Sequence, residues 1–127
     1  MELVKPKKIF IVDEDSLFAS QLKSTLIEKA GHEVHVFGSC ADCLGAIADK
    51  PAIIVLDNHL NNTEKDKATD MHLLDILRKD YPDVHIIVLA KEEGYGTAMQ
   101  TILHGAEQYI IKDEKTLEAV HAMVGEL

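Results

Sequence analysis

Hydrophobic residues recur along the chain in two alternating patterns, short apolar runs and longer amphipathic stretches. Five runs rich in Ile and Val predict β-strands: KIFIVD (8–13), EVHVF (33–37), AIIVLD (52–57), VHIIVLA (84–90) and QYIIK (108–112). The first, third and fourth runs are almost continuously apolar, which is typical of strands covered on both faces. The second run alternates apolar and polar residues, so we expect it to form an edge strand.

The stretches between these runs carry apolar residues at helical spacing. They predict helices over Ser16 to Ala30, from Ser39 onwards, over Met71 to Lys79, over Thr97 to His104 and after Asp113, which we expect to act as a cap. In the first of them we expect Phe18, Leu22, Leu26 and Ala30 to face the core. Strand and helix alternate five times, which predicts an α/β fold built on one doubly wound parallel sheet with helices on both faces.

Length and charge narrow the class of protein further. A chain of 127 residues suits a single domain over residues 1–127. A formal net charge of -9 argues against direct binding to nucleic acid, because phosphate groups are bound by clustered Lys and Arg. No apolar run approaches the roughly 20 residues of a membrane span, and the amino terminus does not resemble a signal peptide. We therefore predict a cytoplasmic protein with no membrane contact.

Charged residues end three of the predicted strands. Asp13 and Glu14 follow the first strand, Asp57 ends the third, and Lys112 ends the fifth. In open parallel sheets, functional groups gather beyond the carboxyl ends of the strands. If the strand order is 2-1-3-4-5, the first and third strands are neighbours and the three carboxylates converge. Carboxylates so close together repel one another unless a cation lies among them, which predicts a Mg²⁺ site.

A carboxylate, a divalent metal ion and a lysine are the groups that phosphoryl transfer to an aspartate requires. Asp57, alone on its strand, is the candidate nucleophile, and Asp13 and Glu14 are the candidate metal ligands. Lys112 is long enough to reach the same cluster. The alternative for Asp57 is a cap of the following turn, and for Lys112 a surface charge.

On these residues the chain resembles the receiver domain of two-component response regulators over nearly its whole length. The resemblance implies a flavodoxin-like (βα)5 fold with strand order 2-1-3-4-5. It also implies that Asp57 is the phosphoacceptor and that Lys112 pairs with the phosphoryl group. The segments AGHEVHVFGS and HGAEQYIIKD read like the receiver segments around the second and fifth strands.

The same resemblance implies further roles. The backbone carbonyl of His59 falls on a metal contact, beside the side chains of Asp13, Glu14 and Asp57. Tyr109 falls on the aromatic residue whose rotation reports phosphorylation. The implied partners are a histidine kinase or a histidine phosphotransfer protein, and downstream either an effector protein or a covalently linked output domain. A homodimer is also implied as an option. No enzymatic activity is expected beyond self-phosphorylation from a phosphodonor and autodephosphorylation.

The chain departs from the receiver pattern in two main places. Ala90 stands where receivers usually have Thr or Ser, whose hydroxyl binds the phosphoryl group. Such a hydrogen bond contributes about 1.5–3 kcal/mol when one partner is charged, so coupling between Asp57 and Tyr109 is expected to be altered. Asn61 stands where the family usually has Pro, and a long segment, NTEKDKATD, follows it.

Two other functions stay open from the residues alone. A receiver that has lost its switch would act as a phosphorylation-independent interaction module, as Ala90 suggests. The run IFIVDEDSL also fits the pattern of haloacid-dehalogenase-type phosphatases, with Asp13 as nucleophile and Asp15 as general acid. Leu17 and the residues after the fourth strand fit that phosphatase pattern poorly.

The cysteines and histidines are weaker candidates for functional sites. Cys40 and Cys43 form a C-x-x-C pair that is either redox-active or simply two small residues near a helix start. The seven histidines are scattered singly and are expected at the surface.

Overall fold

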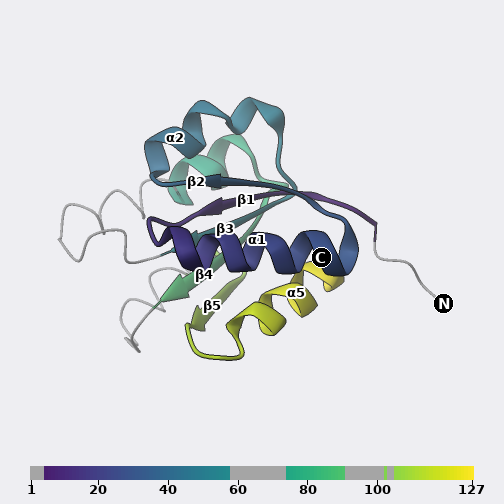
Figure 1. Cartoon of the computed structure of the whole chain (residues 1–127). Coiled ribbons are helices and arrows are strands. Elements are labelled where there is room, and N and C mark those ends of the chain that lie inside the picture. Colours follow the sequence, from purple (N-terminus) through teal and green to yellow (C-terminus); the bar gives the residue numbers. More distant parts are fainter. Residues whose placement is uncertain (1–4, 58–73, 91–101, 103–104) are drawn as a thin grey trace.

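The computed structural model describes residues 5–57, 74–90, 102 and 105–127, and the fold is shown in Figure 1. The strands are β1 (Lys8–Val12), β2 (Glu33–Phe37), β3 (Ile53–Asp57), β4 (His85–Ala90) and β5 (Gln108–Ile111). All strand pairs are parallel, in the order β2-β1-β3-β4-β5. The five predicted strands and the predicted order are therefore confirmed, and β2 lies at an edge as expected.

Helices cover both faces of the sheet. They are α1 (Ser16–Ala30), α2 (Cys40–Gly45), a 3-10 turn η1 (Ile47–Asp49) and α5 (Thr116–Glu126), and residues 74–80 are also helical. Helices α1 and α5 pack on one face, and α2 and the helix over 74–80 pack on the other (Figure 1). Most of the helix predicted over Thr97 to His104 lies outside the described residues. Within the described part of the chain, no helix is both long and apolar enough to span a membrane.

Local hydrogen bonds explain where α1 and α2 begin and end. The Asp15 carboxylate accepts the N–H of Phe18 at 3.1 Å and so caps the amino end of α1. Gly31 ends this helix in the left-handed region with a φ of 67°. Ser39 accepts the N–H of Asp42 at 3.1 Å, which confirms the predicted start of α2.

The predicted cap of the last helix is wrong. Lys115, not Asp113, occupies the N-cap position of α5. The Asp113 carboxylate accepts the N–H of Lys115 at 2.7 Å, and the Asp113 N–H donates to the Thr116 hydroxyl at 2.7 Å. Asp113 therefore closes a tight turn after β5, and the helix begins only when that turn is complete.

The core forms two layers, one on each face of the sheet. Successive side chains of β1 alternate between the layers, because strand side chains point to opposite faces in turn. Ile9 and Ile11 pack beneath α1 and α5, whereas Phe10 and Val12 pack beneath α2. Each central strand therefore buries both faces, which explains the continuous apolar runs.

Both cysteines belong to the layer beneath α2. Cys40 and Cys43 are buried and form no disulfide. Burial raises the pKa of the Cys43 thiol to about 12, so the reactive thiolate is strongly disfavoured. These residues are packed core side chains, and nothing in their surroundings favours the redox interpretation.

The expectation that the histidines lie at the surface is wrong for His32. Its side chain is only 3% exposed, and its Nδ1 accepts the backbone N–H of Lys7 at 2.9 Å. The chain turns sharply at Gly31 and enters β2 at Glu33, which brings His32 inward against the segment before β1. Burial lowers the pKa of His32, and the charges of Lys7 and His121 lower it further.

This buried histidine makes stability depend on pH. Because the pKa of His32 is lower in the folded chain than its ordinary value of 6.5, the unfolded chain binds the proton more readily. Its stabilising contribution is therefore complete above about pH 6.5 and is lost as the pH falls below that value. We expect the free energy of unfolding of the wild type to fall more steeply than that of His32→Asn between about pH 7.5 and pH 5. Urea unfolding at several pH values measures both curves, and parallel curves would contradict the prediction.

Candidate functional site

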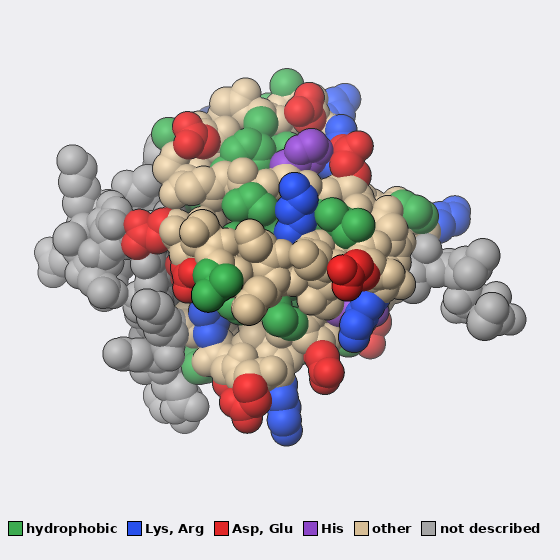
Figure 2. Space-filling view, viewed as in Figure 1, with side chains coloured by type: hydrophobic (Ala, Val, Ile, Leu, Met, Phe, Trp, Pro, Cys, Tyr) green, Lys and Arg blue, Asp and Glu red, His purple; other side chains and the backbone are tan. Residues whose placement is uncertain are grey.

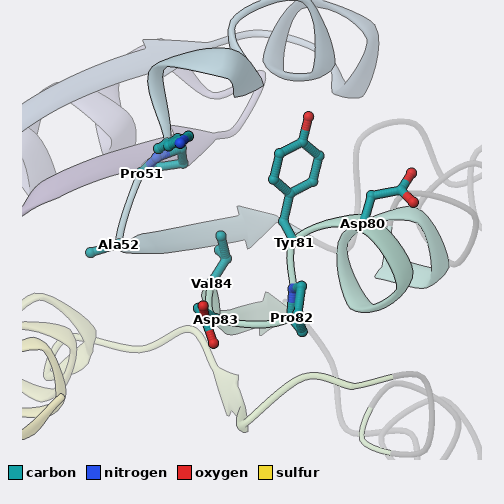
Figure 3. A pocket seen from close by; sticks show the side chains of 8 residues that line it. Pro51, Ala52, Asp80, Tyr81, Pro82, Asp83 and Val84 are labelled. Carbon is teal, nitrogen blue, oxygen red and sulfur yellow. The ribbon is translucent and has the colours of Figure 1, made fainter.

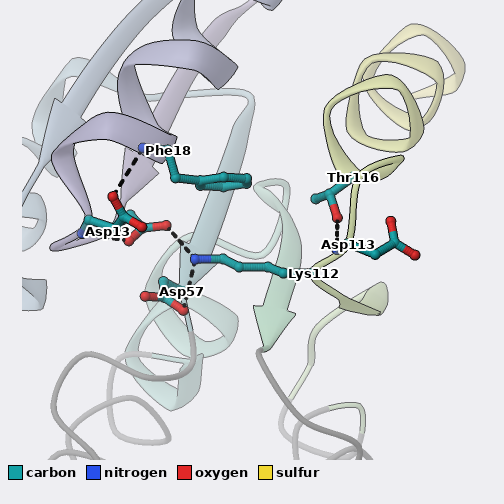
Figure 4. Close-up of polar contacts among 7 residues, drawn as sticks. Asp13, Phe18, Asp57, Lys112, Asp113 and Thr116 are labelled. Atoms are coloured by element: carbon teal, nitrogen blue, oxygen red, sulfur yellow. Dashed lines mark hydrogen bonds and ion pairs between the residues drawn. The ribbon is translucent and has the colours of Figure 1, made fainter.

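Two buried carboxylates lie side by side at the carboxyl edge of the sheet. Val12 of β1 pairs with Leu56 of β3, so Asp13 and Asp57, each one residue further, leave the sheet together. Both residues are only 3% exposed. The Lys112 ammonium lies between them, with Nζ 3.0 Å from Asp13 Oδ2 and 3.5 Å from Asp57 Oδ1 (Figure 4). The strand order thus brings together side chains that are far apart in the sequence.

The backbone around β4 and β5 determines where Lys112 lies. The Lys112 N–H donates to the Ala90 carbonyl at 2.7 Å, which continues the ladder between β4 and β5 by one residue. From there the side chain reaches over the end of β4 towards β3 and β1, and it is only 12% exposed. Lys112 is therefore a mostly buried cation with two anionic partners, which does not fit the alternative of a surface charge.

The charges at this edge do not balance. Burial raises the pKa of Asp13 from 3.8 to about 6, and the Asp57 charge also raises it. The N–H of Asp15, which donates to Asp13 at 2.9 Å, and the nearby Lys112 lower it again. One ammonium thus faces two buried carboxylates, and the exposed Glu14 adds a third acidic group next to Asp13 in the chain. Among the residues that the structure describes, this edge therefore carries more acidic than basic groups.

This donor set fits a hard divalent cation. Mg²⁺ prefers oxygen ligands, retains several waters and is often held by only one or two carboxylates. Asp13 and Asp57 supply buried oxygens, and an added cation would offset their excess charge. In the part of the chain that the structure describes, no three or more His, Cys, Asp and Glu side chains form a metal-binding group. His59, whose carbonyl was predicted to contribute, lies outside the described residues.

Phe18 packs against the core beneath α1 and α5, as predicted, and its ring also contacts this charged cluster. The Lys112 ammonium lies 4.3 Å from the centre of the Phe18 ring. This distance is within the range of a cation–π interaction. Phe18 belongs to the first turn of α1, which begins at Ser16 after the N-cap Asp15, close to Asp13 and Glu14 in the chain. That position was the signal in the sequence that could have pointed to the site.

The two residues predicted to form the switch lie on neighbouring strands of the sheet. Ala90 is the fully buried last residue of β4, and Tyr109 of β5 pairs with Val88. Because side chains alternate along a strand, Ala90 and Val88 share the face against which Tyr109 packs. Ala90 therefore presents a methyl group on this face of β4, at the position where the family pattern has a hydroxyl. Asn61 and the segment after it lie outside the described residues.

A hollow of about 430 Å³ opens at the opposite edge of the sheet (Figure 3). It lies where the chain enters β3 and β4, and it is lined by Lys50, Pro51, Ala52, Asp80, Tyr81, Pro82, Asp83 and Val84. Because β3 runs from this edge to Asp57, the hollow is separated from the carboxylates by the length of the strand. It is not part of the charged cluster.

Comparison with known proteins identifies the class to which this fold and cluster belong. The sequence pattern of the response regulator receiver domain matches residues 9–124. The chain therefore belongs to the response regulator receiver family, as its residues suggested.

Two solved structures and one curated protein illustrate the relationship. The photosynthetic apparatus regulatory protein RegA of Cereibacter sphaeroides is 28% identical over 97% of this chain and 64% of its own length. The receiver domain of NtrX from Brucella abortus is 26% identical with a TM-score of 0.75, covering 93% of this chain and 98% of that one. A response regulator from Burkholderia pseudomallei, solved with a phosphorylated aspartic acid, a calcium ion and citrate, is 28% identical. Its TM-score is 0.77, over 93% of this chain and 66% of that one.

The chain is shorter than the curated relatives it matches. It spans 64% of RegA and 21% of the luminescence regulatory protein LuxO of Vibrio campbellii. The similarity thus covers the receiver region of these regulators.

Proposed function

We propose that the chain is a phosphoacceptor receiver that takes a phosphoryl group on Asp57 and signals through altered protein contacts. The observation that carries the proposal is the position of the Lys112 ammonium between Asp13 and Asp57, at 3.0 and 3.5 Å. A buried carboxylate with an adjacent cation and an acidic neighbour is suited to accept a phosphoryl group, because charge on the phosphoryl oxygens is then offset.

The reaction transfers one phosphoryl group and leaves the protein as an acyl phosphate. A carboxylate oxygen of Asp57 attacks the phosphorus atom of the donor, either a phosphohistidine or a small acyl phosphate. The new P–O bond forms as the bond from phosphorus to the donor nitrogen or oxygen breaks, and the donor keeps that electron pair. The Lys112 ammonium, which contacts a carboxylate oxygen before the transfer, contacts a phosphoryl oxygen afterwards. Hydrolysis of the acyl phosphate later restores Asp57.

We infer that the same site binds Mg²⁺, and the oxygen donors at this edge of the sheet support this inference. Asp13, Glu14 and Asp57 would hold the ion with their carboxylate oxygens, together with the backbone carbonyl of His59. When bound, the ion neutralises charge on the phosphoryl oxygens. The related response regulator from Burkholderia pseudomallei supports this assignment, because its structure holds both a phosphorylated aspartic acid and a calcium ion.

The partners follow from the family. We infer that a histidine kinase or a histidine phosphotransfer protein supplies the phosphoryl group. The greater length of the curated relatives supports an output domain that is covalently linked to the receiver. A separate effector protein or a homodimer is the alternative means of passing on the signal.

On the face covered by α1 and α5, acidic, basic and hydrophobic side chains are interspersed (Figure 2). Leu17, 70% exposed in the first turn of α1 beside the site, is suited to contact a donor protein.

A phosphorylation-independent interaction module is the second candidate, and Ala90 is the observation that favours it. Without a hydroxyl at this position, phosphorylation of Asp57 has one hydrogen bond fewer with which to move Tyr109. The phosphatase hypothesis has lost its support. The chain belongs to the receiver family, and the Asp15 carboxylate caps helix α1.

Replacement of the phosphoacceptor tests the proposal. We expect wild-type protein incubated with acetyl phosphate and Mg²⁺ to gain the mass of one phosphoryl group, and Asp57→Asn to gain none. An amide cannot form the acyl phosphate, whereas it preserves the size of the side chain. Intact-protein mass spectrometry measures the modification, and Asp83→Asn, at the opposite edge of the sheet, serves as the matched control.

The same samples distinguish the two candidate functions. If the proposal holds, beryllofluoride with Mg²⁺ shifts the NMR signals of Tyr109 and β5 in the wild type and leaves those of Asp57→Asn unchanged. A wild type that gains no mass and binds no Mg²⁺ at millimolar concentrations would instead establish the interaction module. Equal modification of wild type and Asp57→Asn would show that the phosphoacceptor lies elsewhere.

A further inference from the structure

We propose that Phe18 is a positioning residue for Lys112, and that the face of its aromatic ring holds the ammonium in place between the two carboxylates. The effect on phosphoryl transfer rests on the proposed function, whereas the effect on Lys112 itself does not. The proposal gives a role in the site to a residue whose helical position alone predicts only core packing.

Three elements surround the ammonium. Asp13 follows β1, Asp57 ends β3, and Phe18 extends from the first turn of α1 (Figure 4). The distances from Nζ are 3.0 Å to Asp13, 3.5 Å to Asp57 and 4.3 Å to the centre of the Phe18 ring. The two carboxylates attract the ammonium by charge, and the ring attracts it through the negative potential of its face.

The backbone at Phe18 is itself fixed by the site. Its N–H donates to the Asp15 carboxylate at 3.1 Å, and the Asp15 N–H donates to Asp13 at 2.9 Å. These two hydrogen bonds connect the amino end of α1 to the carboxylate that pairs with Lys112. The ring is therefore attached to an anchored turn, and its position relative to the ammonium is well defined.

The chemical nature of the ring explains why it suits this position. A lysine ammonium is strongly hydrated and has three donors, which a polar neighbour or a water would occupy. The ring attracts the charge but offers no oxygen or nitrogen acceptor. The N–H donors of Lys112 thus remain directed at carboxylate oxygens and, after transfer, at phosphoryl oxygens. An aliphatic side chain would exclude water equally well but would not attract the charge.

Fluorinated phenylalanines separate these two roles. Fluorine substituents on the ring progressively weaken the negative potential of its face while keeping the ring apolar and nearly the same size. We would place mono-, di- and trifluorophenylalanine at position 18, together with Phe18→Leu and the conservative variant Phe18→Tyr. Gln21→Ala, which changes an exposed residue in the next turn of the same helix, is the matched control.

Two measurements are made on each variant. The first is the NMR shift of the Lys112 side-chain Hε and Nζ signals in unphosphorylated protein, assigned with Lys112→Arg. The second is the rate of phosphorylation by acetyl phosphate with Mg²⁺. We expect the Lys112 signals to move stepwise with each added fluorine and the rate to fall about fivefold to thirtyfold across the series and in Phe18→Leu. Phe18→Tyr and Gln21→Ala should remain near the wild type.

The possible outcomes lead to distinct conclusions. A purely structural ring would give the same Lys112 shifts and the same rate in all fluorinated variants, and that result would overturn the inference. Stepwise Lys112 shifts with a constant phosphorylation rate would confirm the contact with the ammonium but overturn its role in the reaction. If the wild type takes no phosphoryl group, the proposed function fails. In that case, Lys112 shifts that follow the fluorine series would still establish that the ring holds the ammonium.

Discussion

Replacing Lys112 with methionine is expected to lower the free energy of unfolding by about 2–3 kcal/mol near pH 8 in the presence of a chelator. The substitution preserves the apolar stem but leaves Asp13 and Asp57, both 3% exposed, without the cation that lies 3.0 and 3.5 Å away. Removing one partner of a buried ion pair usually costs about 3–5 kcal/mol. The cost is smaller here because Asp13, whose pKa is already about 6, can take up a proton.

A double-mutant cycle isolates the electrostatic part of this loss. Asp13→Asn combined with Lys112→Met removes one of the two repelling charges, so we expect the double variant to recover most of the stability. Lys112→Arg retains the cation and is the conservative control. Urea unfolding followed by far-UV circular dichroism is measured on the wild type, the single variants Lys112→Met and Asp13→Asn, the double variant and Lys112→Arg. A Lys112→Met protein as stable as the wild type would show that the carboxylates do not depend on the ammonium.

The second large effect is expected at Gly105, where alanine should cost about 2–4 kcal/mol of unfolding free energy. Gly105 has a φ of 111°, a conformation that residues with a side chain rarely adopt. A methyl group there would overlap the Cγ and Cδ atoms of Arg78. The Arg78 guanidinium donates to the carbonyls of Pro82, at 3.3 Å, and Val84, so displacing the arginine also loses these bonds.

Two other glycines provide graded controls for this prediction. Gly31 has a φ of 67°, but an added methyl group would meet no atom, so Gly31→Ala should cost only about 1 kcal/mol. Gly45 lies in α2, where φ is not positive and an added methyl group would meet no atom. Gly45→Ala should therefore leave stability unchanged or raise it by up to about 1 kcal/mol. Thermal and urea unfolding of the three variants test this order. Equal losses at Gly105 and Gly31 would exclude a contribution from Arg78.

The fold followed almost entirely from hydrophobic patterning. Continuous apolar runs such as Ile53–Asp57 are typical of strands that bury both faces, and they matched the observed strands to within one residue. Alternation of strands and helices then restricted the topology to a doubly wound parallel sheet. Strand ends carrying Asp13, Asp57 and Lys112 indicated the edge at which the charged cluster lies, because all strands of such a sheet end on one side.

The parts that patterning missed depend on tertiary contacts. Phe18 has the helical spacing of a core residue. Its place in the first turn of α1 indicates that it lies near the site, but the contact between its ring and a cation depends on the folded position of Lys112. His32 looks like an ordinary loop histidine until the Lys7 N–H is placed beside it. Asp113 has the residue type of a helix cap, but the turn after β5 uses its carboxylate first. Each of these residues has a side chain suited to two roles, and the packing of distant segments selects one of them.

The order of strands along the chain also has a consequence for biosynthesis. Strands β2, β1 and β3, with both carboxylates, are complete by Asp57, whereas Lys112 follows the final strand. In a nascent chain emerging from the ribosome, Asp13 and Asp57 can therefore come close together before Lys112, their cationic partner, has been synthesised. The same holds for a mature molecule in which β5 and α5 detach transiently. The charge cluster on which the proposed reaction depends is therefore complete only after the last strand has joined the sheet. An incompletely folded molecule lacks this cluster.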